Sequence, residues 1–264
     1  MDLKLKGKIA LITGSTAGIG YGIAKKIAEE GATVVLNGRK NEALQKAVEQ
    51  LKAETSNENI SGIAADFSNK EDVKQLIAQL PEVDILINNV GIFNQVAFKD
   101  ISDEEWFEMF DINVMSGVRL ARHYFPKMMA KNEGRIIFIS SESALNIPTE
   151  MVHYGMSKTA QLAVSRGLSR LSKGSNVTVN CVLPGPTWSR ANKKGMEDLA
   201  KSENKTVDEV VNDFFEHRRP TSLTQRFAEV EEVANLVAFV ASPLSSSTNG
   251  AALRVDGGIA NYIL

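Results

Sequence analysis

Near its N-terminus the chain reads Lys8-Ile-Ala-Leu-Ile-Thr13-Gly14-Ser-Thr-Ala-Gly18-Ile-Gly20, and this segment indicates its class of fold. An apolar run of strand length leads into a glycine turn, which leads into a segment with apolar residues at helical spacing. This order suits a dinucleotide, because glycines let the backbone approach a pyrophosphate and the start of a helix offers free N–H groups. The glycine spacing is G-x-x-x-G-x-G, and a tight turn with close helix packing is the alternative interpretation.

Strand-like and helix-like segments alternate along the rest of the chain. The expected strands are mostly continuous apolar runs, at 9–13, 33–37, 60–65, 85–88, 135–140, 177–183 and 252–255. The expected helices are 19–30, 41–55, 70–79, 103–131, 153–173 and 230–241. This alternation predicts an α/β fold, a doubly wound, Rossmann-type parallel sheet of about seven strands with helices on both faces. We expect a single domain over residues 1–264.

The segment 187–224 does not fit the alternation. It is polar and charged, with helical patches at 196–202 and 207–217. Because ligands bind outside the carboxyl ends of strands in open α/β sheets, we expect it to be a substrate lid. A surface excursion or a subunit contact is the alternative. Its aromatic residues suit an apolar substrate and its basic residues suit an acidic one, so the sequence does not decide the polarity of the substrate. These residues are Trp188, Phe214, Phe215, Lys193, Lys194, Arg218 and Arg219.

Composition narrows the classes of partner. The chain has 264 residues with a net charge of −2, which gives no electrostatic basis for binding nucleic acid. The single cysteine, Cys181, lies in an apolar run and predicts a buried thiol, and the three histidines lack metal-ligand spacing. No apolar run reaches the ~20 residues of a membrane span, and the first residues show no signal-peptide pattern. We therefore expect a cytoplasmic protein that binds no metal, nucleic acid or membrane.

The stretch Tyr154-Gly-Met-Ser-Lys158 places a phenol and an ammonium four residues apart in an expected helix. At that spacing the two side chains share one face of the helix. A free tyrosine titrates near pH ~10, and a positive charge about 4 Å away at an effective dielectric of ~20 supplies roughly the 4 kcal/mol that would bring its pKa towards neutrality. The pair predicts a tyrosine that acts as a general acid and base, with a solvated helix face as the alternative.

In these features the chain resembles the short-chain dehydrogenase/reductase family of the compact, single-domain type. The resemblance covers nearly the whole chain and rests on motifs in the order Thr13-Gly-Ser-Thr-Ala-Gly-Ile-Gly20, Asp66, Asn88-Asn-Val-Gly91, Asn113, Ser141, Tyr154-Gly-Met-Ser-Lys158, Pro184-Gly185 and Val255-Asp-Gly-Gly258. It implies an oxidoreductase that interconverts a secondary alcohol and a carbonyl by hydride transfer, assembled as a homotetramer or homodimer through helices 103–131 and 153–173. A dehydratase or epimerase, or a non-catalytic NADP-binding sensor, is the alternative.

The resemblance implies four catalytic residues. Tyr154 would exchange a proton with the substrate oxygen, and Lys158 would lower the pKa of Tyr154 and bind the nicotinamide ribose. Ser141 would polarise the carbonyl; its offset of thirteen residues before Tyr154 favours it over the serines at 140 and 143. Asn113 would organise a water that relays protons to Lys158, unless it merely packs within its helix.

The resemblance also implies the residues that contact the cofactor. They are Gly14, Ser15, Thr16, Gly18, Ile19, Gly20, Asn37, Arg39, Asp66, Phe67, Asn89, Val90, Gly91, Tyr154, Lys158, Pro184, Gly185 and Thr187. Asp66 would meet the adenine ring, although an Asp at a strand end also suits a turn or a helix cap. Two neighbours of the catalytic residues, Glu142 and His153, face either substrate or solvent.

The type of nicotinamide follows from the end of the second expected strand, Val34-Val-Leu-Asn-Gly-Arg-Lys40. An NAD site has an acidic residue here that accepts from the ribose 2′-OH. This strand end has none and carries Arg39, whose guanidinium suits a 2′-phosphate. The pattern favours NADP(H), with Asn37 and Arg39 as contacts and NAD(H) as the alternative. Against this, Arg39 also suits a solvated helix start, and Ala17 stands where some NADP-binding relatives carry a second basic residue.

Overall fold

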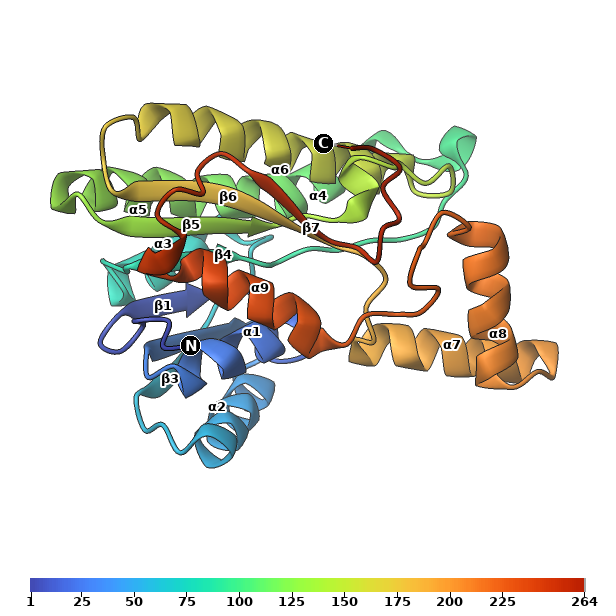
Figure 1. Cartoon of the computed structure of the whole chain (residues 1–264), viewed down its shortest axis with the longest axis horizontal. Helices are drawn as coiled ribbons and strands as arrows, with labels where there is room; N and C mark the ends of the chain where they lie inside the picture. Colours follow the sequence, from blue (N-terminus) through green and yellow to red (C-terminus); the bar gives the residue numbers. More distant parts are fainter. Residues whose placement is uncertain (264) are drawn as a thin grey trace.

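The computed structural model describes residues 1–263 and contains a single parallel sheet with the strand order β3-β2-β1-β4-β5-β6-β7 (Figure 1). Every neighbouring pair of strands runs in parallel. The strands are β1 (Ile9–Ile12), β2 (Thr33–Gly38), β3 (Ile60–Ala64), β4 (Ile85–Asn88), β5 (Gly134–Ile139), β6 (Val177–Pro184) and β7 (Ala252–Val255). The predicted doubly wound, seven-stranded α/β fold is confirmed. The strand order reverses between β1 and β4, which is where such folds bind ligands.

Helices cover both faces of this sheet. The helices are α1 (Gly18–Glu29), α2 (Asn41–Thr55), α3 (Lys70–Gln79), α4 (Asp103–Phe110), α5 (Ser116–Lys131), α6 (Val152–Leu171), α7 (Arg190–Glu203), α8 (Val207–Asp213) and α9 (Val230–Ala241). One core cluster joins the sheet to α1, α2 and α9, and the other joins it to α3, α5 and α6. No helix within residues 1–263 combines the length and the apolar surface that a membrane span needs.

The central strands form because their side chains are mostly apolar on both sides. In β1, Ala10 and Ile12 belong to the first core cluster and Leu11 belongs to the second. Successive side chains of a strand point to opposite faces, so a continuous apolar run suits a strand that helices cover on both sides. The same reasoning located all seven strands to within two residues at either end.

One predicted helix, 103–131, is interrupted in the structure. It divides into α4, a π-helical turn at Asp111–Met115 and α5. The prediction of one uniform helix is therefore wrong, because apolar spacing does not distinguish a π-helical turn from regular α-helix. The turn matters because it carries Asn113, which is 1% exposed, and π-turns occur frequently at functional sites.

The segment 187–224 forms α7, α8 and a second π-helical turn at Phe214–Arg218. Figure 1 shows α7 and α8 in orange, projecting beyond one end of the sheet. Aromatic side chains pack at the base of this projection. Trp188 and Phe214 both stack on Phe227, with ring centroids 4.2 and 5.3 Å away, and Phe215 is 1% exposed. The segment is thus anchored by an aromatic cluster, whereas the sequence indicated no strong core stripe.

We expect α7 to exchange its amide hydrogens faster than β6 in the ligand-free protein, because α7 buries only Ala200 whereas every residue of β6 is buried. If 187–224 is a lid, adding NADP with a substrate analogue slows exchange in α7 while α2 is unaffected. Hydrogen–deuterium exchange with mass spectrometry measures both. Protection of ligand-free α7 equal to that of β6 would make the segment a fixed structural element.

Candidate active site

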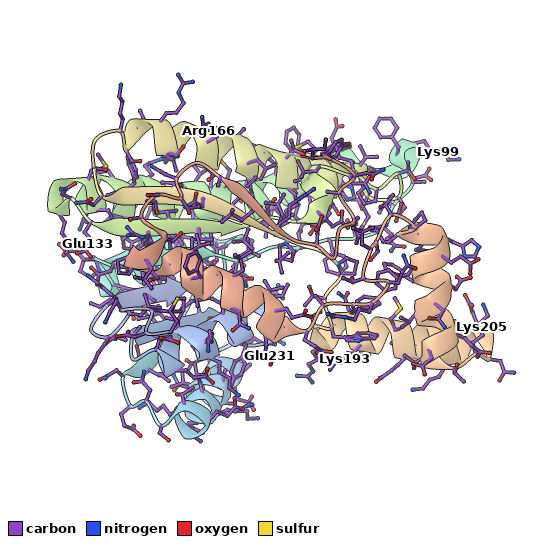
Figure 2. The ribbon with its side chains drawn as sticks, in the orientation of Figure 1. Lys99, Glu133, Arg166, Lys193, Lys205 and Glu231 are labelled. Carbon is purple, nitrogen blue, oxygen red and sulfur yellow. The ribbon has the colours of Figure 1, made fainter. Side chains whose placement is uncertain are left out.

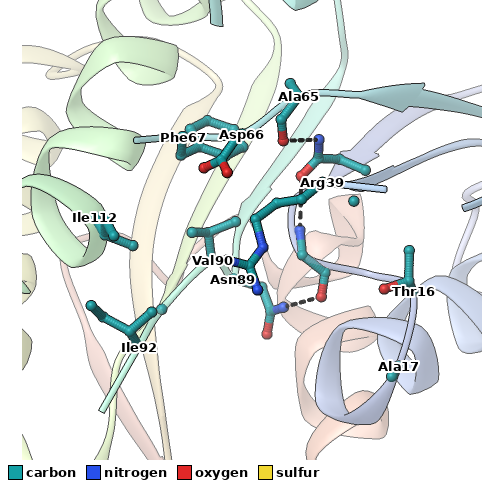
Figure 3. A pocket seen from close by; sticks show the side chains of 14 residues that line it. Thr16, Ala17, Arg39, Ala65, Asp66, Phe67, Asn89, Val90, Ile92 and Ile112 are labelled. Carbon is teal, nitrogen blue, oxygen red and sulfur yellow. Dashed lines mark hydrogen bonds between the residues drawn. The ribbon is translucent and has the colours of Figure 1, made fainter. Parts of the chain in front are cut away.

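Two cavities lie at the carboxyl ends of the central strands. The first has a volume of about 300 Å³, and its lining is Gly14, Thr16, Ala17, Asn37, Gly38, Arg39, Ala65, Asp66, Phe67, Asn89, Val90, Gly91, Ile92 and Ile112 (Figure 3). The second has a volume of about 190 Å³ and lies over Ser141 and Tyr154. Residues from distant parts of the sequence therefore meet at one edge of the sheet, as the strand order predicts.

The glycine loop between β1 and α1 needs glycine for two different reasons. Gly14 and Gly18 have φ angles of +60° and +58°, in the left-handed region that side chains with a Cβ rarely adopt. Gly20 is required by close approach, because a Cβ there would lie 2.4 Å from both Nδ2 of Asn89 and the carbonyl oxygen of Gly14. The loop also orders Ser15, which is fully buried with its hydroxyl donating to the Ile12 carbonyl at 2.7 Å.

The first turn of α1 is free to receive an anion. Its N-cap residue, Ala17, offers no side-chain cap, and the first turn contains no acidic residue. The orphan N–H groups and the positive end of the helix dipole therefore face the loop without an internal partner from a side chain. Thr16 and Ala17 both line the first cavity. This loop and helix start fit a pyrophosphate group.

Asn37 and Arg39 have different roles at the end of β2. Asn37 is 1% exposed, and its Oδ1 accepts from the Gly14 amide at 3.1 Å while its Nδ2 donates to the carbonyls of Ile63 and Ala65. Its amide is thus already bonded within the protein. Arg39 is exposed, lines the first cavity and makes no hydrogen bond within residues 1–263 (Figure 3). Arg39 is the group at this strand end that is available to a ligand.

Asp66 forms a turn and does not cap α3. Its Oδ1 accepts from the backbone N–H and the hydroxyl of Ser68, and these bonds, with the charge of Arg39, hold the pKa of Asp66 below its usual value. The helix cap is Asn69, which accepts from the Glu71 amide. Asp66 and the buried Phe67 both line the first cavity.

The second cavity brings together the predicted serine and tyrosine. Ser141 and Tyr154 both line it, and the Ser141 hydroxyl is close enough to lower the pKa of Tyr154 by hydrogen bonding. Ser140 is turned away, because its hydroxyl donates to the Lys158 carbonyl at 2.9 Å. Ser143 lines the cavity and donates its backbone N–H to Oγ of Ser141 at 3.1 Å, which holds that hydroxyl in place.

The pKa of Tyr154 is opposite to expectation. Burial raises it to about 12, and the hydrogen bond from Ser141 and the charge of Arg219 offset this only in part. Lys158 is not among the groups that lower it, since its Nζ lies 5.6 Å from the ring centroid and donates to the Ile139 carbonyl at 3.0 Å. The expected charge effect assumed about 4 Å between charge and phenol. Burial also lowers the pKa of Lys158 to about 8.

Asn113 is fixed by the π-helical turn. Its Oδ1 accepts from the Ile92 amide at 2.7 Å, and its Nδ2 donates to the Ile92 carbonyl and to Oγ of Ser157. A Cβ at Gly91 would lie 3.5 Å from Oδ1 of Asn113 and 3.4 Å from Nζ of Lys158. The structure therefore places Asn113, Gly91 and Lys158 together between the two cavities.

Gln161 joins this group, and the sequence analysis missed it. Its Nε2 donates to the Asn113 carbonyl at 2.6 Å, and its Oε1 accepts from Nζ of Lys158 at 3.4 Å. This orientation of the amide is the one that satisfies both partners, because a carbonyl only accepts and an ammonium only donates. Gln161 therefore links the Asn113 carbonyl to the Lys158 ammonium, the two groups between which a water relay is expected. The available signal was spacing, since residues three apart share a helix face.

The turn after β6 completes the floor of the second cavity. Pro184 ends the strand, and Gly185 packs so closely on Asp256 that a Cβ would lie 2.8 Å from the Asp256 Cα. Thr187 is 1% exposed and donates its hydroxyl to the Gly185 carbonyl at 2.9 Å. A Cβ at Gly18 would lie 3.5 Å from Ser189, so the segment that begins here passes beside the glycine loop.

The structure gives different surroundings to Glu142 and His153, for which the sequence did not decide between substrate and solvent. Glu142 and Arg219 line the second cavity and bond each other. His153 is fully buried elsewhere, with Nε2 2.6 Å from Oδ1 of Asn94 and its ring against Trp106. Figure 2 shows Lys193 at the outer surface. Within residues 1–263 there is no cluster of His, Cys, Asp and Glu side chains that suits a metal ion.

Known proteins are similar to this chain in sequence and in fold. A family model described as short chain dehydrogenase matches residues 8–200. The uncharacterized oxidoreductase YvaG of Bacillus subtilis is 47% identical, with all of both chains covered, and the uncharacterized oxidoreductase YvrD of the same organism is 47% identical over 98% of both chains. The crystal structure of L-sorbose reductase from Gluconobacter frateurii, complexed with NADPH and L-sorbose, matches with a TM-score of 0.92 at 31% identity and full coverage of both chains.

Replacing Gln161 by Leu should lower the pKa of Lys158 further below about 8, because the variant removes an acceptor that stabilises the ammonium form. A shift of about one unit is expected for the loss of one charge-assisted hydrogen bond. NMR titration of ¹⁵N-labelled lysine side chains measures it. The control is Gln50→Leu on the exposed side of α2, which should leave Lys158 unchanged. An unchanged pKa in Gln161→Leu would show that Gln161 does not hold the ammonium.

Proposed function

The chain belongs to the short-chain dehydrogenase/reductase family and is an NAD(P)-dependent enzyme, and from this we propose that it reduces a ketone to a secondary alcohol with NADPH. The proposal rests on the segment 91–93, whose residues line both cavities. Gly91 and Ile92 line the first cavity, whereas Phe93 lines the second and lies edge-on to Tyr154 with ring centroids 6.1 Å apart. Cofactor and carbonyl sites are therefore adjacent.

The first cavity fits the adenosine and pyrophosphate part of NADPH, a cofactor that supplies the hydride when bound. The glycine loop and the uncapped start of α1 would hold the pyrophosphate. Asp66, Phe67, Asn89, Val90 and Gly91 would line the adenosine half, and the turn at Pro184, Gly185 and Thr187 would lie at the nicotinamide half. Arg39 would bind the 2′-phosphate, since its guanidinium is exposed at the cavity and bonds no other group within residues 1–263.

Tyr154 would donate the proton. A pKa of about 12 keeps its phenol protonated at neutral pH, which is the state that protonates a developing alkoxide. Ser141 would hold the carbonyl oxygen beside that phenol. The ammonium of Lys158 would lie on the same face of α6 as Tyr154. It donates hydrogen bonds to the Ile139 carbonyl and to Gln161. Asn113 would organise a water that relays protons to Lys158, and its carbonyl also positions Gln161.

The proposal extends to assembly and location. Phe107 is 74% exposed on α4 and Leu171 is 67% exposed at the end of α6. Burial of these apolar side chains against other copies of the chain supports a homotetramer or homodimer through these helices. We place the enzyme in the cytoplasm, with a small molecule as its substrate and the segment 187–224 as the lid over it.

Tyr154→Phe should reduce kcat by at least ~10²–10⁴-fold, because the proton donor is lost. NADPH binding, followed by fluorescence, should stay near that of the wild type. Turnover is measured as stoichiometric loss of NADPH absorbance with a reducible ketone. Tyr21→Phe is the control, since that phenol lines neither cavity. More than a tenth of the wild-type kcat in Tyr154→Phe would rule out the proton-donor role.

Arg39→Asp should shift the preference from NADPH towards NADH, because a carboxylate repels a 2′-phosphate and accepts from a free ribose hydroxyl. One charge-assisted contact is worth ~1.5–3 kcal/mol, so the ratio of kcat/KM values for the two cofactors should change ~10–100-fold. Lys40→Asp is the matched control, because Lys40 is equally exposed but does not line the cavity. Equal use of both cofactors by the wild type would contradict the assignment of Arg39.

A further inference from the structure

The substrate cavity is small and mixed in character. Its volume of about 190 Å³ is below the ~300 Å³ at which pockets for drug-sized ligands begin. Its apolar lining consists of Phe93, Met151, Pro186, Met196, Phe214 and Phe227. Its charged lining consists of Glu142, Glu150 and Arg219. A cavity of this size takes a substrate of few carbon atoms, and its charged groups decide which one.

A buried ion pair lies beside the reacting groups. Glu142 directly follows Ser141, and its Oε1 accepts from Nε of Arg219 at 3.1 Å. The two side chains are only 4% and 9% exposed. The other carboxylate oxygen, Oε2 of Glu142, has no hydrogen-bond partner. Burial raises the pKa of Glu142, and Arg219 and the nearby Ser143 hydroxyl offset this only in part. The Ser143 hydroxyl makes no hydrogen bond of normal geometry to Oε2. A buried carboxylate oxygen without a donor is costly unless a ligand supplies one.

Arg219 is already balanced by acidic groups. Besides Glu142 it lies 3.8 Å from Oε1 of Glu150, and its Nη1 donates to the Arg218 carbonyl at 2.8 Å. Two carboxylates thus face one guanidinium in the cavity lining. An anionic substrate would meet an excess of negative charge, so the basic residues of 187–224 do not make this an acid-binding site. The same residues, Glu150 and Arg219, also line an outer polar cavity of about 450 Å³ beside it.

We infer that the substrate is a small, uncharged ketone that carries hydroxyl groups, and that Glu142 selects it by accepting a hydroxyl hydrogen at Oε2. The inference rests on the proposed ketone reduction and specifies its substrate class. A hydroxylated ketone supplies the donor that Oε2 lacks, while its carbonyl lies beside Ser141 and Tyr154. A ketone without hydroxyls leaves the carboxylate unpaired, and sites built in this way reject such analogues strongly. A keto acid adds a second negative charge to the same cavity.

Three substrates with four carbons each test the inference. They are erythrulose, which has hydroxyls, 2-butanone, which has none, and 2-oxobutanoate, which is an anion. Using NADPH oxidation, we expect kcat/KM to be highest for erythrulose, with an advantage over 2-butanone of at least ~10–100-fold from the charge-assisted hydrogen bond. 2-Oxobutanoate should be the poorest of the three.

Variants at the ion pair test the role of Glu142. Glu142→Gln removes the charge with little change of shape, and we expect the erythrulose to 2-butanone ratio of kcat/KM to fall ~10-fold or more. Glu142→Leu/Arg219→Leu replaces the whole pair by apolar groups, a change that buried ion pairs often tolerate, and should lower the ratio further. The matched control is Glu216→Gln, an exposed position three residues before Arg219 that should keep the wild-type ratio. Thermal unfolding checks each variant, and if the double variant does not fold, Glu142→Gln decides.

The outcomes separate this inference from the proposed function. Efficient reduction of 2-butanone or 2-oxobutanoate without preference for erythrulose would overturn the substrate class while ketone reduction stands. An unchanged ratio in folded Glu142→Gln and in the double variant would overturn the role of Glu142. Reduction of none of the three ketones by enzyme that binds NADPH normally would overturn both the proposed reduction and this inference.

Discussion

The side-chain amides of Asn37, which is buried, and of Asn89, which is partly buried, hold the loop between β1 and α1, and the first cavity depends on where that loop lies. Asn37 ties the Gly14 amide to the carbonyls that end β3, and Asn89 donates both of its N–H bonds to the carbonyls of Thr13 and Gly14. These amides satisfy backbone groups that a turn at the centre of a sheet would otherwise leave unpaired. Because Gly20 packs directly on Asn89, the bond network and the glycines require each other, and the anion site at α1 is fixed before any ligand arrives.

The buried ammonium of Lys158 imposes the second constraint. A cation that is 4% exposed needs acceptors, and it has the carbonyl at the end of β5 and the amide of Gln161. Gln161 in turn needs the Asn113 carbonyl, which a regular α-helix would use for its own i→i+4 bond. The π-helical turn at Asp111–Met115 changes that bonding pattern. The irregularity in the helix and the charge in the site are thus parts of one hydrogen-bond network.

The sequence predicted the fold well because its signals are local. Apolar runs and glycine turns located the strands, and their alternation with helices indicated a parallel, doubly wound sheet, whereas the strand order comes from the structure. Short motifs also predicted many of the residues that line the two cavities, such as Ser141 and Tyr154, whose chemical roles stay predictions. The bridge by Gln161, the bonded state of Asn37 and the raised pKa of Tyr154 depend on tertiary burial and on distances of 3–6 Å between segments far apart in sequence. Spacing can place Lys158 and Gln161 on one helix face, but neither spacing nor composition fixes these distances or the degree of burial.

The two cavities also differ in charge, and this difference explains how one edge of the sheet can serve two ligands. The first cavity combines an uncapped helix start with Arg39, both suited to phosphate, and its one acid, Asp66, is bonded in a turn. The second cavity surrounds its arginine with two carboxylates. The phosphate groups of the proposed cofactor would therefore be attracted to the first cavity and repelled from the second. The charges of the two cavities neither attract nor repel an uncharged substrate strongly. Hydrogen bonds from its hydroxyl groups would therefore determine where it binds. Electrostatics would thus direct the phosphate groups of the proposed cofactor, but not its uncharged nicotinamide end, to the first cavity.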